Sequence, residues 1–159
     1  MSEGVTRKSG GLPLPPLIYL SAIAIGIILD AVYPLAWFSQ PMSDILVAAG
    51  LVALFAVAAL LFTAIASMRR AKTTLNPNAV ADHLITNGPF AVTRNPMYLA
   101  NTLLLMGIGM IFGSTWFLLL AIVAAFATQK LAIEREEKML MEKFGKKYRD
   151  YAKRVRRWI

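Results

Sequence analysis

The most regular feature of the sequence is a series of long apolar runs separated by short polar segments. The first run, residues 17–38, would form a helix of ~33 Å at ~1.5 Å per residue, which is enough to cross the ~30 Å hydrocarbon core of a bilayer. The second, residues 45–68, is rich in alanine and leucine. Only the short polar segment 39–44 separates the two runs. The pattern therefore predicts two membrane helices joined as a hairpin.

The third apolar run extends from Met97 to Ala127 and is too long for one ordinary crossing. As a single helix it would reach ~46 Å, which exceeds the bilayer core even with tilt. The sequence Phe-Gly-Ser-Thr at Phe112–Thr115 offers a natural break. We therefore expect two short transmembrane helices here, at residues 97–112 and 115–130.

Charge supports an even number of crossings. Basic residues stand at the N-terminus, after the second run, before the third run and after the fourth: Arg7, Lys8, Arg69, Arg70, Lys72, Arg94 and the tail from Lys130. Positive residues that flank membrane helices concentrate on the cytoplasmic side. We therefore expect both termini to lie in the cytoplasm, with the four helices in the cell membrane and residues 1–16 as an N-terminal tail.

The sequence pattern of the tail, residues 131–159, predicts an amphipathic basic helix. From Lys130 onward it holds 11 lysines and arginines against 5 acids, a net charge of +6 out of +8 for the chain. Apolar residues recur at spacings of three and four, which places them on one helical face: Leu140, Phe144, Tyr148, Tyr151, Val155 and Trp158. The pattern is typical of a helix on an anionic lipid surface or over the ends of the spans. No nucleic-acid partner is expected, because the charge is juxtamembrane and no nucleic-acid motif accompanies it.

Composition agrees with a membrane protein. Hydrophobic residues make up 57% of the 159, charged residues 16%, and the mean hydropathy is +0.57. The chain has no cysteine and one histidine, which excludes a disulfide framework, a thiolate nucleophile and a Cys- or His-cluster metal site. The expected fold is an all-α integral membrane bundle of four transmembrane helices with a C-terminal amphipathic cytoplasmic helix, in one domain over 1–159.

Rigid and charged residues cluster before the third apolar run, in the sequence TNGPFAVTRNPMYLA. Gly88-Pro89 and Asn95-Pro96 both restrict the backbone, and Pro96 suits the first turn of a helix. A purely structural interpretation would make Arg94 a headgroup anchor and Tyr98 part of an aromatic belt.

Three acids follow the fourth run and suggest more than an anchor. Glu134, Glu136 and Glu137 stand where a hairpin of two short helices would return the chain to the level of Arg94 and Tyr98. Carboxylates, an arginine and a tyrosine together suit a zwitterionic, cationic ligand. The alternative is an ordinary run of surface charge, in which glutamates favour the first turn of a helix.

These motifs in combination resemble the isoprenylcysteine carboxyl methyltransferase and phospholipid methyltransferase superfamily of integral membrane enzymes. The resemblance rests on Gly-Pro-Phe at 88–90, Arg-Asn-Pro-Met-Tyr at 94–98, Glu-Glu-x-x-Leu at 136–140, Phe-Gly at 144–145, and the tyrosines at 148 and 151. It covers nearly half of the chain, and the first two apolar runs match only in being apolar.

The resemblance implies S-adenosylmethionine as the methyl donor, bound at the cytoplasmic face. Carried over by position, Asn95, Tyr98 and Glu137 would hold the donor, Pro96 would shape the turn, and Glu136 would support it. Arg94 and both glutamates are the candidate catalytic residues, with either glutamate as the base for an amine or thiol acceptor. His83 either lines the pocket or is a solvated loop residue. The partner would be a lipophilic small molecule or lipid entering from the bilayer.

Two positions depart from the superfamily pattern. Its usual histidine is Asn95, which can form hydrogen bonds but cannot act as a general base. Its arginine four residues before the glutamate pair is Ala132, so the resemblance does not point to a prenylcysteine carboxylate as substrate. Two alternative functions stay open at this point: a non-catalytic membrane protein of the same fold that binds lipid or a partner, and an NADPH-dependent reductase of the sterol reductase type.

Overall fold

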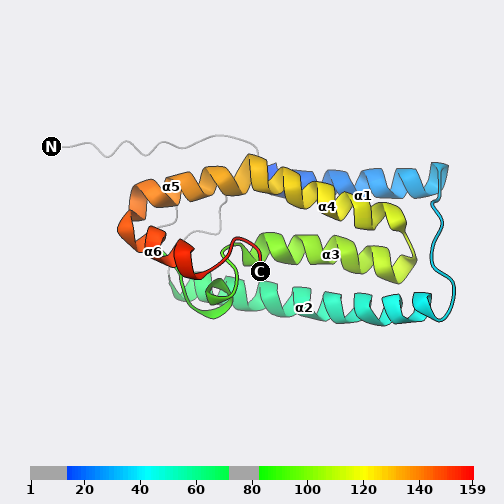
Figure 1. Ribbon diagram of the computed structural model, residues 1–159, viewed down its shortest axis with the longest axis horizontal. Coiled ribbons are helices and arrows are strands. Elements are labelled where there is room, and N and C mark those ends of the chain that lie inside the picture. Colours follow the sequence, from blue (N-terminus) through cyan, green and yellow to red (C-terminus); the bar gives the residue numbers. More distant parts are fainter. Residues whose placement is uncertain (1–13, 72–82) are drawn as a thin grey trace.

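The computed structural model describes residues 14–71 and 83–159, and these residues form a helical protein (Figure 1). The helical elements are α1 (Leu14–Val32), α2 (Met42–Arg70), the 3-10 turn η1 (Gly88–Ala91), α3 (Pro96–Phe112), α4 (Thr115–Thr128), the π-helical segment η2 (Gln129–Ile133), α5 (Glu134–Phe144) and α6 (Lys146–Arg154). Within the described ranges there is no β-strand, only an isolated bridge between Thr93 and Arg156.

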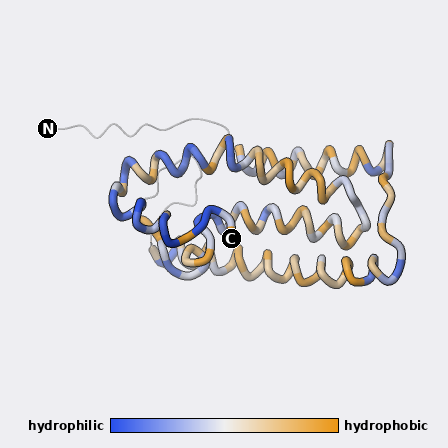
Figure 2. Tube along the Cα trace, in the orientation of Figure 1, coloured by the Kyte–Doolittle hydropathy of each residue, from blue (hydrophilic) through white to orange (hydrophobic). Residues whose placement is uncertain are grey.

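The four apolar helices lie side by side, with α3 packed against α2 and α4, and α4 packed against α1 (Figure 1). Hydrophobic residues follow the length of this bundle, whereas hydrophilic residues gather at the end that carries α5 and α6 (Figure 2). Among the residues that the structure describes, three helices are long and apolar enough to cross a membrane: α1, α2 and the continuous helix Thr115–Phe144. The length and composition of these helices are those of membrane-spanning segments. Because α3 has only 17 residues, the four-span arrangement stays a prediction.

Helix ends follow local backbone preferences. The helix α1 stops at Val32, short of the expected residue 38, because Pro34 disfavours helical geometry at the residue before it. The break between α3 and α4 lies at the predicted position, between residues 112 and 115. Gly113 caps α3 with a left-handed φ of 70°, and the hydroxyl of Ser114 accepts a 3.3 Å hydrogen bond from the backbone N–H of Phe117.

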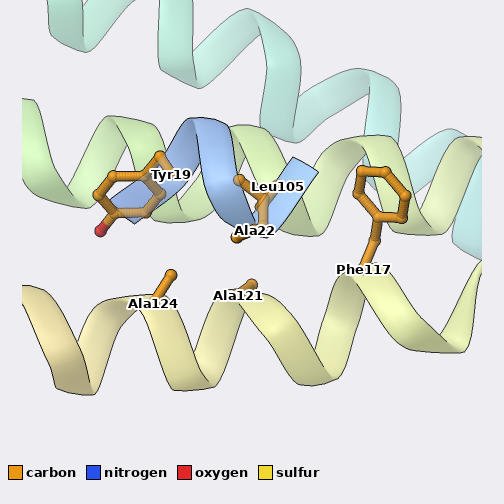
Figure 3. Packing of buried hydrophobic residues seen from close by; sticks show 6 residues of the cluster. All are labelled: Tyr19, Ala22, Leu105, Phe117, Ala121 and Ala124. Atoms are coloured by element: carbon orange, nitrogen blue, oxygen red, sulfur yellow. The ribbon is translucent and has the colours of Figure 1, made fainter. Parts of the chain in front are cut away.

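Small residues allow the helices to approach closely. A buried cluster links α1, α3 and α4 and consists of Tyr19, Ala22, Leu105, Phe117, Ala121 and Ala124 (Figure 3). Between α2 and α3, a Cβ atom added to Gly50 would lie 2.9 Å from the backbone oxygen of Gly107. This is the packing expected where lipid surrounds the helices and small side chains, rather than the hydrophobic effect, bring backbones together.

The bundle is closed at one end by contacts between its two loops. The indole nitrogen of Trp116 donates a 2.7 Å hydrogen bond to the carbonyl of Tyr33, and the hydroxyl of Thr115 donates a 3.0 Å bond to the carbonyl of Ala36. Trp37 packs over Gly113, where an added Cβ would lie 3.1 Å from its ring. The loop that follows α1 is thus held against the α3–α4 turn.

The prediction of one amphipathic helix over residues 131–159 is wrong. The helix continues from α4 through the π-helical segment into α5 and then breaks at Gly145, whose φ of 52° is accessible mainly to glycine. After α6 the chain becomes extended at Val155. We call Val155–Ile159 the C-terminal strap.

The apolar spacing of the tail nevertheless identified the right buried residues. Tyr148, Tyr151 and Val155 are buried, and Leu140 and Phe144 pack against them. The break at Gly145 preserves this face while turning α6 back toward the start of α3 (Figure 1). The Tyr151 hydroxyl donates a 2.6 Å hydrogen bond to the carbonyl of Phe90, and burial raises the pKa of this tyrosine to about 12.

Candidate functional site

The candidate site lies at the polar end of the bundle, where the chain enters α3. Backbone N–H groups of Val92 and Thr93 both donate to the carbonyl of Pro89 at 3.1 Å, which closes the η1 turn. Pro96 is buried in the first turn of α3, where its missing N–H leaves no helical hydrogen bond unmade. The prolines therefore fix the entry of the Arg94–Tyr98 turn into the bundle.

Tyr98 connects the start of α3 to α5. Its hydroxyl donates a 2.5 Å hydrogen bond to a carboxylate oxygen of Glu136. The carbonyl of Tyr98 accepts a 3.3 Å hydrogen bond from the hydroxyl of Tyr19 in α1, and that hydroxyl is 2.8 Å from the hydroxyl of Thr102. A line of polar groups thus extends from the carboxylate of Glu136 into the bundle between α1 and α3.

Glu137 is the centre of a second set of contacts. One of its oxygens lies 3.1 Å from Nη1 of Arg94 and 3.0 Å from Nε of Arg157, and the other lies 2.7 Å from Nη2 of Arg157. The exposed fractions of these side chains are 15% for Arg94, 16% for Glu137 and 30% for Arg157. Two guanidinium groups therefore share one largely buried carboxylate, and both of its oxygens are engaged.

Glu137 and burial shift the pKa values of the groups around this carboxylate. The hydrogen bond to Glu137 raises the pKa of Arg157. Burial raises the pKa of Tyr148, and Glu137 adds to this rise while Arg94 opposes it. Tyr148 therefore stays neutral near pH 7 and accepts a 3.3 Å hydrogen bond from Nη1 of Arg94. The Nε of Arg94 is buried and has no hydrogen-bond partner within the part of the chain that the structure describes.

The C-terminal strap binds to the Arg94–Tyr98 turn through its backbone. The carbonyl of Arg157 accepts hydrogen bonds from the side-chain amide of Asn95 at 2.9 Å and from the hydroxyl of Thr93 at 3.1 Å. The carbonyl of Arg156 accepts from the backbone N–H of Arg94 at 3.0 Å. The strap thus ties the turn to the end of the chain.

The other end of the strap reaches the π-helical segment. The indole nitrogen of Trp158 donates a 2.8 Å hydrogen bond to the side chain of Gln129. π-Helical turns inside α-helices are rare and often stand at functional sites. This one lies directly before the three glutamates, where Lys130 pairs with Glu134 at 2.8 Å. The strap, the turn and the start of α5 therefore form one polar cluster.

The structure brings together most of the residues that the sequence singled out. Arg94 meets Glu137, and Tyr98 meets Glu136, as the hairpin argument expected. The side-chain amide of Asn95 binds the strap. His83 is exposed in the segment that leads into η1.

The contribution of the strap was not predictable from the sequence pattern. Arg157 has no distinguishing pattern in the sequence, because it is one of many basic residues in the tail. Thr93 is fully buried and was not singled out. Trp158 was noted only as part of an apolar face, and its indole N–H in fact carries a polar contact. Only the fold shows that these residues converge.

The fold and the cluster define a helical membrane protein with a charged site at the end of its apolar bundle. The chain matches the phospholipid methyltransferase family over residues 45–147, which is more than half of its length, and it belongs to that family. The family implies methyltransferase activity in general. A comparison with curated proteins gave no match. The matched region contains every candidate residue from His83 to Glu137, whereas the C-terminal strap lies beyond it.

Proposed function

We propose that the protein transfers a methyl group from S-adenosylmethionine to a small lipophilic or lipid-like acceptor at the cytoplasmic surface of the cell membrane. The observation that carries this proposal is the hydrogen bond between Tyr98 and Glu136 at the polar end of an apolar bundle. It joins the two segments that hold the family's charged residues, at the level where a water-soluble donor and a bilayer-soluble acceptor can meet.

The residues of the site fit the chemistry of this donor. S-adenosylmethionine carries a carboxylate, an ammonium and a positive sulfonium. Arg94 supplies a guanidinium for the carboxylate, and Glu136 supplies a carboxylate for a positive centre. The aromatic ring of Tyr98 next to Glu136 suits the same positive charge.

The bound donor would supply an activated methyl group whose transfer is an in-line displacement. The protein then has to align the acceptor, exclude water and, for an amine or thiol acceptor, remove a proton. Both oxygens of Glu137 already carry arginine contacts. Glu136, held by a neutral hydroxyl, is therefore the better base. It takes the acceptor proton as the acceptor lone pair forms the bond to the methyl carbon and the C–S bond breaks.

The acceptor is expected to reach the site from the lipid. Large apolar side chains are strongly exposed along the bundle, including Phe55 at 79% and Phe62 at 76% on α2. Such exposure is costly in water but ordinary against acyl chains. A lipophilic acceptor can thus stay in the bilayer while only its reactive group approaches Glu136.

The test is calorimetric titration of S-adenosylhomocysteine, the product form of the donor, into the purified chain in nanodiscs. The wild type should bind saturably. Glu136→Gln removes the negative charge at nearly constant shape, and Tyr98→Phe removes only the hydroxyl. Glu136→Gln should weaken binding ~10-fold or more, because hydrogen bonds that involve charged groups contribute ~1.5–3 kcal/mol. Tyr98→Phe should weaken binding less, because it keeps the ring and removes only the hydrogen bond that orients Glu136.

Matched control variants distinguish the site from general effects. Glu142→Gln makes the same change at an exposed position of α5, and Tyr33→Phe makes the same change at an exposed tyrosine after α1. Both should bind like the wild type. If the wild type does not bind S-adenosylhomocysteine at millimolar concentration, the methyltransferase proposal fails. Binding of NADPH instead would favour a reductase, and binding of neither would favour a non-catalytic role.

A further inference from the structure

The candidate site has a cationic pole and an acidic pole that are built from different residues. At the acidic pole, Glu136 is held by the Tyr98 hydroxyl. At the cationic pole, Arg94 and Arg157 share the single carboxylate of Glu137. One positive charge at this pole is therefore uncompensated by Glu137. Such a pole suits an anionic group.

The next acid near this pole, Glu134, is shared between Lys130 and Arg157. Its oxygen lies 2.8 Å from Nζ of Lys130 and 4.0 Å from Nη1 of Arg157, so its contact with Arg157 is a long ion pair and not a hydrogen bond. Arg157 binds Glu137 through Nε and Nη2, so the N–H groups of Nη1 form no hydrogen bond with either glutamate. With 30% of its side chain exposed, Arg157 is the more accessible of the two arginines.

The strap holds this guanidinium in a defined place. The carbonyl of Arg157 is anchored by Asn95 and Thr93, and Trp158 is anchored by Gln129. The backbone of Arg157 and the side chain of the next residue, Trp158, are therefore both held in place.

We propose that Arg157 is a donor-binding residue, which recognises the carboxylate of the donor's amino-acid group together with Arg94. Glu137 then acts as a positioning residue that keeps the two guanidinium groups side by side. Two arginines oriented by one acid offer the carboxylate directional hydrogen bonds as well as charge. This proposal rests on the proposed function, and it adds a residue that lies outside the family-matched segment 45–147.

The experiment compares two ligands that differ only in the carboxylate. S-adenosylhomocysteine and its decarboxylated analogue are titrated by calorimetry into the full chain in nanodiscs. The variants are Arg157→Ala and Arg156→Ala, which remove the same charge from adjacent positions. Arg156 is exposed, and its backbone carbonyl makes its contact with the Arg94–Tyr98 turn. Arg157→Lys is added as a variant that keeps the charge, and thermal unfolding by circular dichroism confirms that each variant is folded.

The expected result is a selective loss. Arg157→Ala should weaken S-adenosylhomocysteine binding by ~10-fold or more and change binding of the decarboxylated analogue by less than ~2-fold, because only the first ligand has the charged partner. Arg156→Ala should leave both affinities unchanged. Arg157→Lys should recover part of the loss, since an ammonium keeps the charge but not the fork of donors.

Other outcomes overturn the proposal in distinguishable ways. Equal weakening of both ligands by Arg157→Ala would show that the strap only maintains the shape of the site. Tighter binding of S-adenosylhomocysteine would show that the guanidinium competes with the donor. Normal binding in the wild type with no effect of Arg157→Ala would refute the role of Arg157 alone. Absence of any binding by the wild type would refute the proposed function and this inference together.

Discussion

At the scale of single residues, Glu137 is where the charges of the site converge, and its removal should destabilise the protein. Glu137→Gln would leave Arg94 and Arg157 facing each other without the carboxylate between them. Breaking a buried ion pair from one side costs ~3–5 kcal/mol, and we expect ~2 kcal/mol here because the group is partly exposed. Reversible denaturation in mixed micelles measures this loss in the free energy of unfolding.

Two further variants show whether the loss comes from the ion pair. Glu142→Gln, an equal change of charge at an exposed position of the same helix, should cost less than ~0.5 kcal/mol. The double variant Glu137→Gln/Arg157→Gln should be less destabilised than the sum of its single variants, since it removes one of the unpaired cations. An effect of Glu137→Gln no larger than that of Glu142→Gln would contradict the importance of the cluster.

The pairs of this site were predictable from the sequence to different degrees. A helical hairpin returns the chain to the level it left, which sufficed to predict that Arg94 and Tyr98 lie near the glutamates. It did not predict which pairs form, because Glu136 and Glu137 are adjacent and point in different directions on a helix. Nor did it predict the place of Arg157, which depends on an extended strap that no helical period describes.

At the scale of helices, the contact between α2 and α3 depends on the absence of side chains. A Cβ atom on Gly50 would lie 2.8 Å from Cγ1 of Ile111 and 2.9 Å from the backbone oxygen of Gly107. The backbone oxygen cannot move away by a change of rotamer, as a side-chain atom can. Gly50→Ala should therefore force the helices apart and cost ~1–3 kcal/mol of unfolding free energy, the usual range for overpacking.

The control for this prediction is a neighbouring position on the same helix. Ala49 is exposed, so Ala49→Val adds more carbon than Gly50→Ala but places it toward lipid. Denaturation of both variants under the conditions used for Glu137 should show a loss only for Gly50→Ala. If Gly50→Ala is as stable as the wild type, the close approach of α2 and α3 is incorrect.

The helices themselves were predictable where local chemistry decides their ends. Phe-Gly-Ser-Thr located the α3–α4 break because glycine and serine both terminate or cap helices. The π-helical segment and the reversal at Gly145 were not predicted. A periodicity of three and four residues is the same on either side of a break, so the apolar face of the tail concealed the turn that Gly145 makes.

At the scale of the whole molecule, the four-crossing arrangement with both termini in the cytoplasm can be tested by labelling single cysteines. The chain has no native cysteine, so each variant carries one reactive thiol. Ser39 lies between α1 and α2, and Phe112 lies at the α3–α4 turn, whereas Arg69 and Lys147 are exposed near the polar end. We expect Ser39→Cys and Phe112→Cys to react with a membrane-impermeant maleimide on intact cells. Arg69→Cys and Lys147→Cys should react only after permeabilisation.

The physical reason for this expectation is that the polar end carries most of the excess positive charge. Translocating a cluster of lysines and arginines across the bilayer is costly, so basic segments stay on the cytoplasmic side. Each outcome has a separate meaning. A complete inversion of the pattern would show that the orientation is wrong while the crossings are right. Labelling of Phe112→Cys together with Lys147→Cys from one side would show that α3 and α4 do not both cross, because the turn between them would then lie on the side of the site.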